Sequence, residues 1–364
     1  MSNGNSPKLY IAGMGMVTPV GGNVAMTAAA VNAGISAYGL SSYQTDEGKP
    51  ITMARVPDRI FAEFFGEIDE GDRFNPRHDR VVKMAIIALK EACANKSTEQ
   101  PVPLVLAMPD IRGDDQGLSS VVENIAANVQ PWVSAEISRG IHSGRASGME
   151  AIDFIFKYIY NSDYPFVLVG GSDCHEDYSR LMPLENEGRL LTALSKDGFA
   201  PGEAASFLLL TPHIDLALKR DGNVIALFPP GIADEKGHLF SDEPYRGEGL
   251  DQAFKKAFVN QPEKNIHSIY SSMNGESHWA KEYGVAYLRN KKMFKEPVRT
   301  EHPADCYGDV GSATATTLII LAAEHLFKHN NAKSHLVYCS SDTAKRGALV
   351  VEKINVNTTK DAQE

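Results

Sequence analysis

Apolar residues along the chain form two alternating kinds of segment. Short runs such as residues 102–108, 166–171 and 205–210 are almost wholly apolar, which is typical of strands in a sheet covered on both faces. Longer segments such as residues 79–95 carry apolar residues at helical spacing. This alternation predicts an α/β protein of layered helices and strands. We also expect strands that begin at residue 9 and span residues 224–228, 266–272, 336–339 and 348–351, and helices over residues 24–32, 119–129, 146–160, 250–259, 279–289 and 311–327.

The two most apolar predicted helices occupy corresponding places in the two halves of the chain, at residues 146–160 and 311–327. The first is apolar on more than one side, which is typical of a central helix. Its small residues Ala146, Gly148 and Ala151 would let a neighbouring backbone approach closely. We therefore expect the first helix to be buried at the centre of the molecule.

The length of 364 residues exceeds one ordinary compact domain and suits two packed halves. Because the order of elements repeats, we expect an N-terminal half over residues 1–220, which carries loop excursions, and a C-terminal half over residues 221–354. The polar residues 355–364 are expected to form a disordered tail.

The composition excludes several classes of protein. A net charge of -10 argues against a nucleic-acid partner, because neutralising phosphates needs clustered lysine and arginine. The four cysteines are scattered without a CxxC pair, so neither a zinc site nor a disulfide framework is expected, and no metal or cofactor is predicted. No apolar run approaches the roughly 18 residues of a membrane span, and the polar residues 1–8 lack the apolar core of a signal peptide. A cytoplasmic protein is expected.

Two motifs resemble the β-ketoacyl-acyl-carrier-protein synthases of the thiolase-like superfamily. Residues 143–152 are similar to the turn that presents the family's nucleophilic cysteine at a helix N-terminus, but Arg145 stands in the place of that cysteine. Residues 197–205 resemble the family run Asp-Gly-Phe-x-x-Gly-Glu-Gly-Ala. The resemblance implies a duplicated thiolase-like fold with five layers, αβαβα. It also implies structural or pocket roles for Asp197, Gly198, Phe199, Glu203, Gly275 and Gly311, with Glu203 buried.

This sequence also departs from the family pattern at the other catalytic positions. By the resemblance, Asn274 replaces the first catalytic histidine and Cys306 replaces the second. Residues 342–347 are charged where the family has a Gly-Phe-Gly-Gly turn. A condensing enzyme needs an activated nucleophile and groups aimed at the developing charge. We therefore expect no catalytic residues and a protein that is not a working condensing enzyme.

The alternative to an inactive protein is an enzyme that uses other residues for catalysis. Cys306 with His302 or His278 could form a thiolate pair and serve a diverged acyltransferase or an acyl-thioester-binding enzyme. An ordinary buried cysteine is the favoured interpretation. Cys174 and His175 are adjacent in sequence and favour a structural or surface role. A third possibility is a ligand sensor in which Arg145 binds a carboxylate or another anion.

The favoured function is a catalytically degenerate, dimeric scaffold that binds another protein. The resemblance implies a homodimer, because family members pair through a sheet-edge strand beside the nucleophile helix. It also permits an accessory chaperone or adaptor role for a type VI secretion effector.

Arg145 itself needs a partner if it is buried. The positive end of a helix disfavours a guanidinium, and desolvation adds several kcal/mol unless the charge is paired. The acidic candidates are Glu276, Asp305, Asp309 and Asp342. We expect at least one of them, or a bound anion, within hydrogen-bond distance of Arg145. The alternative is that the side chain turns out to water.

Overall fold

A large mixed sheet dominates the computed structural model, which describes residues 6–66, 76–110, 118, 120–193, 195, 197–259 and 261–356. Ten strands follow one another in the order β11-β10-β12-β13-β8-β1-β7-β6-β4-β5, and β9 pairs with β13. Their bounds are β1 Leu9–Val17, β4 Leu104–Met108, β5 Arg139–His142, β6 Val167–Cys174, β7 Glu203–Thr211, β8 Asn223–Leu227, β9 Gly231–Asp234, β10 Ile266–Ser271, β11 Phe294–Glu301, β12 Ser334–Ser340 and β13 Lys345–Asn355.

The sheet consists of two arrays with the same order and the same strand directions. In β1-β7-β6-β4-β5 the first two pairings are antiparallel and the next two are parallel. The array β8-β13-β12-β10-β11 repeats this pattern. The arrays join edge to edge where Leu9 pairs with Leu227 and Tyr10 with Ala226. The boundary expected after residue 220 lies in the connection between β7 and β8.

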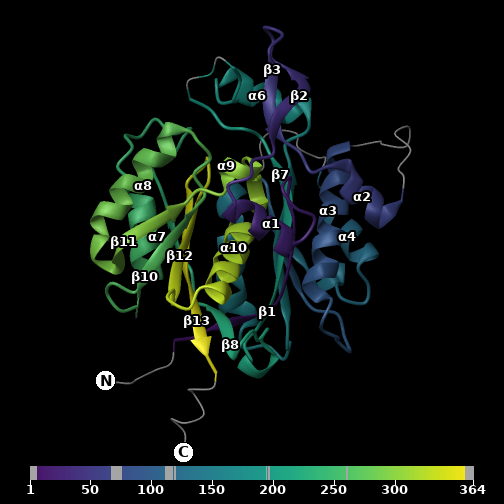
Figure 1. The fold of residues 1–364 in the computed structure, drawn as a ribbon, viewed down its shortest axis with the longest axis vertical. Coiled ribbons are helices and arrows are strands. Elements are labelled where there is room, and N and C mark those ends of the chain that lie inside the picture. The colour runs from purple at the N-terminus through teal and green to yellow at the C-terminus, as the bar shows by residue number, and fades with distance from the viewer. Residues whose placement is uncertain are drawn as a thin grey trace, which may run out of the picture.

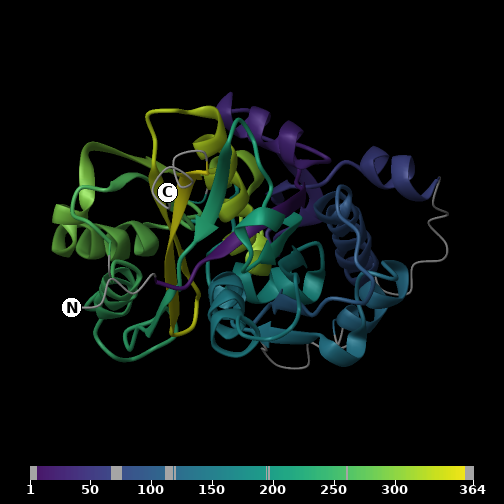
Figure 2. The ribbon, with the colours of Figure 1, turned by 90° about the horizontal axis from the view of Figure 1, so that it is seen from below.

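Helices cover both faces of each array and complete the expected five layers, αβαβα (Figure 1). α5 (Ser147–Phe154) and α10 (Thr314–Lys328) lie between the arrays, with α1 (Val24–Asn32) beside them. α3 (Pro76–Cys93) and α4 (Val121–Asn128) cover the outer face of the N-terminal array, and α7 (Glu248–Ala257) and α8 (Ser277–Arg289) that of the C-terminal array. Figure 2 shows these two outer layers on opposite sides of the molecule.

The central helices pack closely because small residues stand at their contact. A Cβ atom on Gly148 would lie 2.7 Å from the Cβ of Ala315, and one on Gly171 would lie 2.4 Å from the backbone oxygen of Ser312. Met149 and Ile152 are fully buried beside this contact. The prediction of a central, close-packed first helix is confirmed.

Several elements differ from the expectations. The helix expected over residues 146–160 ends as α-helix at Phe154 and continues as a π-helical turn, Ile155–Ile159. The disordered tail was expected over residues 355–364, but Asn355 is the last residue of β13. The Val356 N–H donates to the Gly222 oxygen at 2.9 Å. Residues 357–364 lie outside the described residues.

Excursions from the layered core gather at one end of the molecule (Figure 1). The hairpin of β2 (Tyr38–Gln44) and β3 (Pro50–Ala54) lies there beside α6 (Tyr178–Asn186). Two further helices are short, α2 (Asp58–Phe65) and α9 (Ala304–Tyr307). Within the described residues, no helix is long and apolar enough to cross a membrane.

Candidate functional site

Arg145 lies in a single helical turn, Gly144–Ala146, directly before α5. Gly144 adopts a φ of 63°, a left-handed conformation that favours glycine and turns the chain into the helix. The Arg145 side chain is buried, and each of its guanidinium nitrogens donates a hydrogen bond. Nε donates to the Ser340 oxygen at 2.9 Å, Nη1 to Asp309 at 2.5 Å and Nη2 to Asp342 at 2.7 Å. Arg145 is therefore paired inside the protein rather than turned out to water.

A second buried arginine completes the site. Arg189 donates to both carboxylate oxygens of Glu276, at 2.7 and 2.9 Å, and its Nη1 donates to Asp342 at 2.7 Å. Asp342 thus accepts from both guanidinium groups. We call Arg145, Arg189, Glu276, Asp309 and Asp342 the two-arginine cluster. Three carboxylates face two guanidinium groups, which leaves one formal negative charge.

Neutral donors share that excess charge. Asn274 Nδ2 donates to Asp309 at 2.8 Å and to Glu276 at 3.0 Å. The Trp279 indole N–H donates to Glu276 at 2.9 Å, and the Trp279 ring lies 4.4 Å from Cζ of Arg145. The buried charges are therefore satisfied by hydrogen bonds and by a cation–π contact.

The four acidic candidates have different positions. Asp309 and Asp342 contact Arg145, whereas Glu276 binds Arg189 instead. Asp305 is exposed on α9 and does not join the cluster. Arg189 was missed, because it lies in the loop after α6 and its partners Glu276 and Asp342 are 87 and 153 residues away.

Cys306 lies outside the two-arginine cluster. It lies on α9, packed in the apolar core, and it does not line the cavity at the site. Asp309 stands beside Arg145 and Asn274 instead, and it follows Gly308 as the family histidine follows a glycine. Asp309, rather than Cys306, therefore joins the site around Arg145 and Asn274.

A thiolate pair at Cys306 is not formed either. No hydrogen bond joins Cys306 to His302 or His278 in the part of the chain that the structure describes; His278 packs against Tyr245 and Trp279. Burial, with a contribution from Asp305, raises the pKa of the Cys306 thiol.

The pKa shifts of Arg145 and Asp309 keep both groups charged near neutral pH. Burial by itself would lower the pKa of Arg145, but Asp309, Asp342 and Glu276 outweigh it and raise the pKa. Burial would raise the pKa of Asp309, but Arg145 and His175 hold it below its ordinary value. Arg145 therefore stays charged and Asp309 stays ionised. Asn274, between them, does not titrate.

The remaining predicted pocket residues have structural roles. Asp197 accepts hydrogen bonds from the Ser277 N–H at 2.8 Å and hydroxyl at 2.6 Å, at the start of α8. Phe199 lies under the Arg189 guanidinium, 5.4 Å from its Cζ. Gly275 and Gly311 adopt φ values of 111° and 53°. A Cβ atom on Gly198 would lie 2.9 Å from the Arg189 oxygen. These residues shape the loops that carry the cluster.

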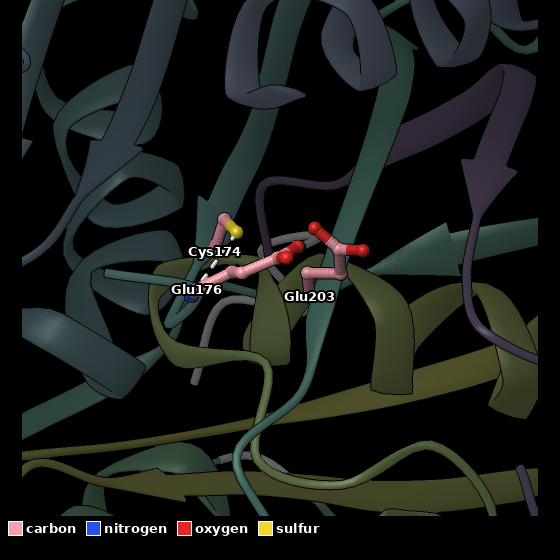
Figure 3. A group of neighbouring side chains, drawn as sticks. All are labelled: Cys174, Glu176 and Glu203. Carbon is pink, nitrogen blue, oxygen red and sulfur yellow. Dashed lines mark hydrogen bonds between the residues drawn. The ribbon is translucent and has the colours of Figure 1, made fainter. Parts of the chain in front are cut away.

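Glu203 is buried, and it belongs to a separate group with Cys174 and Glu176 at the ends of β6 and β7 (Figure 3). Their possible metal-binding atoms lie within 4.8 Å of one another. However, Arg80 Nε donates to Glu203 at 2.8 Å and lies 3.2 Å from Glu176, and burial first, then Glu203, raises the pKa of Cys174 well above its ordinary value. An arginine thus occupies the place of a cation, and we assign this group a structural role.

A cavity of about 470 Å³ lies against the two-arginine cluster. Arg145, Asp309 and Asp342 form part of its wall, and α6 forms another part. The site therefore keeps an open space beside the position where the resemblance expects a nucleophile.

Solved ketosynthase structures share this fold at low sequence identity. The chain is similar to the ishigamide ketosynthase/chain length factor, with a TM-score of 0.73, 17% identity, and coverage of 96% of this chain and 99% of that chain. A ketosynthase in complex with its chain length factor from Xenorhabdus doucetiae gives a TM-score of 0.64, 16% identity, and coverage of 97% and 99%. The ketosynthase from module 6 of the bacillaene synthase of Bacillus subtilis 168 gives 0.69, 14%, and coverage of 95% and 72%.

These likenesses show that the chain has the thiolase-like fold of ketosynthases and chain length factors. No protein-family model matches the chain, and no curated protein matches its sequence.

Proposed function

We propose that this protein is a catalytically inactive, ketosynthase-like subunit that acts by binding another protein. The observation that carries the proposal is that Arg145 and Asn274, at the positions where the family resemblance implies a cysteine and a histidine, both bind the buried carboxylate of Asp309. A buried guanidinium is no nucleophile, an amide cannot shuttle protons, and a carboxylate bound by arginine is a weak base.

The other two interpretations lose support from the same geometry. The thiol of Cys306 is buried away from the cavity with a raised pKa, which disfavours acyl transfer through this cysteine. Each guanidinium nitrogen of Arg145 already donates to a protein oxygen, which disfavours an external anion at this side chain.

An assay of condensation tests the inactive state. We expect no ketoacyl product from acyl and malonyl thioesters with the purified protein. Arg145→Cys alone should also be inactive, because catalytic groups act as a unit and Asn274 and Asp309 remain. Product from either protein above a heat-inactivated control would overturn the proposal.

The free edge of β5 supports a protein partner. β5 ends the strand order, so one side of its backbone has no strand neighbour in the described sheet, and such an edge is a template for pairing with another chain. Ile137 and Tyr158 are exposed near this edge, by 39% and 70%. Arg139 on β5 covers the Phe154 ring, which in turn contacts Tyr158. We propose that this surface forms a two-fold homodimer.

Tyr158→Glu tests the interface, with Leu288→Glu as the matched control. The two side chains are about equally exposed, 70% and 71%, but Leu288 lies on α8, in the outer layer of the C-terminal array. Light scattering should give a dimer mass for the unmodified protein and for Leu288→Glu, and a monomer mass for Tyr158→Glu. A monomeric unmodified protein would contradict the homodimer. It would favour a different partner chain at this edge; one of the similar solved structures is a ketosynthase in complex with its chain length factor.

The identity of a further partner remains a prediction from the family resemblance, including an accessory role for a type VI secretion effector. The proposed place of action is the cytoplasm. Four free, buried cysteines support a reducing compartment. Affinity purification at native expression, followed by mass spectrometry, would identify the bound protein.

A further inference from the structure

His175 is a buried side chain whose polar atoms have no hydrogen-bond partner. It follows β6 directly, is 6% exposed and lines the cavity beside the two-arginine cluster. Neither Nδ1 nor Nε2 finds a partner in the described structure. Leaving a buried polar group unpaired costs free energy, so such a group calls for a ligand or another explanation. The imidazole is held in place by Phe199, whose ring it meets edge-on with 6.1 Å between centroids.

The cavity wall around His175 combines charged and apolar side chains. Arg77 and Arg180 lie at this end, and the first turn of α6 contributes Ser179 and Arg180. The apolar side chains of Pro109, Pro183, Leu184 and Phe199 line other parts of the wall. The volume of about 470 Å³ falls within the range of ligand pockets.

The carboxylates near His175 already have partners. Asp173 is paired with Arg77 and accepts the Ser312 N–H at 3.0 Å, and Asp309 is paired with Arg145. Asp177 accepts the Ser179 N–H at 2.8 Å as the cap of α6. The charge of Arg180 acts on both Asp173 and His175. The position beside His175 and Arg180 therefore suits a negative group better than a positive one.

We propose that this cavity binds a small molecule through a carboxylate or phosphate group that contacts His175 and Arg180, with its apolar part against Pro183 and Leu184. The ligand is held by a different set of residues from the Arg145 cluster. The inference goes beyond the proposed protein-binding role, and its failure would leave that role unchanged.

The proposal predicts a definite response to pH. Burial, together with Arg180 and Arg77, lowers the pKa of His175, against the opposing influence of Asp173 and Asp309. A bound anion adds a negative neighbour and favours the protonated ring. Binding should therefore take up a proton and tighten as the pH falls from about 8 to about 6.

Calorimetric titration of the full chain with inorganic phosphate and, separately, with benzoate is the test. We expect millimolar or tighter binding of at least one probe, with proton uptake measured in buffers of different ionisation enthalpy. Phosphate alone would point to recognition of the charge. Tighter benzoate binding would assign part of the affinity to the apolar wall.

Three variants and one control variant separate the possible outcomes. His175→Ala and Arg180→Ala should each weaken binding about tenfold or more, the effect of losing a hydrogen bond to a charged group. His175→Gln keeps a donor but cannot titrate, so it should retain binding and lose the pH dependence. His213→Gln, at an exposed histidine outside the cavity wall, is the control and should change nothing. No binding of either probe, or equal binding by folded His175→Ala and the unmodified protein, would overturn the proposal.

Discussion

Replacing Arg145 with alanine should cost about 3–5 kcal/mol of the free energy of unfolding, the usual cost of breaking a buried ion pair on one side. The two carboxylates at Arg145 are affected differently. Asp342 keeps Arg189 at 2.7 Å, and its side chain is 20% exposed. Asp309 loses its paired guanidinium and keeps only neutral donors, Asn274 at 2.8 Å and the Gly311 N–H at 2.9 Å. The cost therefore comes mainly from Asp309, which is left charged in a buried place.

The pH dependence of that cost identifies its origin. In the unmodified protein the pKa of Asp309 is held below its ordinary value, so its contribution to stability is present above the unfolded pKa of about 4 and is lost as the pH falls through the folded pKa. Without Arg145, burial dominates and raises the pKa of Asp309. The carboxyl can then take up a proton, and the destabilisation caused by Arg145→Ala should shrink between about pH 7 and about pH 5.

Urea unfolding at both pH values measures the effect, with Arg299→Ala as the control. The Arg299 side chain is 74% exposed and pairs with Glu301 at 2.5 Å, so its loss should cost about 0–1 kcal/mol at either pH. If Arg145→Ala differs from the unmodified protein by less than about 0.5 kcal/mol, the reasoning about the buried cluster is wrong.

Three further outcomes are expected. Gly148→Ala should lower the free energy of unfolding by about 1–3 kcal/mol, because the new Cβ would lie 2.7 Å from that of Ala315. Gly284→Ala, on α8 with no atom within 4 Å of the new Cβ, should be neutral or stabilise by up to about 1 kcal/mol. Urea unfolding measures both variants, and equal effects would contradict the expectation. The thiol of Cys306 should react with iodoacetamide only after denaturant is added, and rapid labelling of the native protein, mapped by mass spectrometry, would refute its burial. Burial and neighbouring histidines hold the pKa of His335 well below its ordinary value, so its contribution to stability should be present above about pH 6.5 and be lost on acidification; unfolding curves of His335→Phe should depend less on pH in this range than those of the unmodified protein.

The duplicated layers could be predicted from the sequence because their strands and central helices are strongly apolar. β4 and β7 are buried at every position. Two of the missed strands lack this signal: β5 has only the residues Arg-Gly-Ile-His, and β11 has a single buried residue and contains Pro297. Both are edge strands, where solvent replaces one neighbour and the apolar pattern weakens.

The sequence predicted those residues of the site that lie in recognisable local motifs. Arg145 and Asn274 were located by their neighbours in sequence, and Asp309 and Asp342 were among the expected partners of Arg145. Cys306 was also expected at the site, but it lies on α9 in the apolar core, and Asp309, three residues later, contacts Arg145 and Asn274. Arg189 carries no sequence signal, since its role arises only from contacts across the fold.

The two-arginine cluster joins the two halves of the molecule at the position where a nucleophile would otherwise stand. Arg145 and Arg189 come from the N-terminal half, whereas Glu276, Asp309 and Asp342 come from the C-terminal half. The helix N-terminus that would lower a thiol pKa is unfavourable to Arg145, and the carboxylates that offset this cost lie 164 and 197 residues further along the chain. Such contacts form only when the two halves are correctly packed. The same contacts therefore favour a fixed relation between the halves, which suits the proposed inactive subunit that presents a rigid surface to a partner.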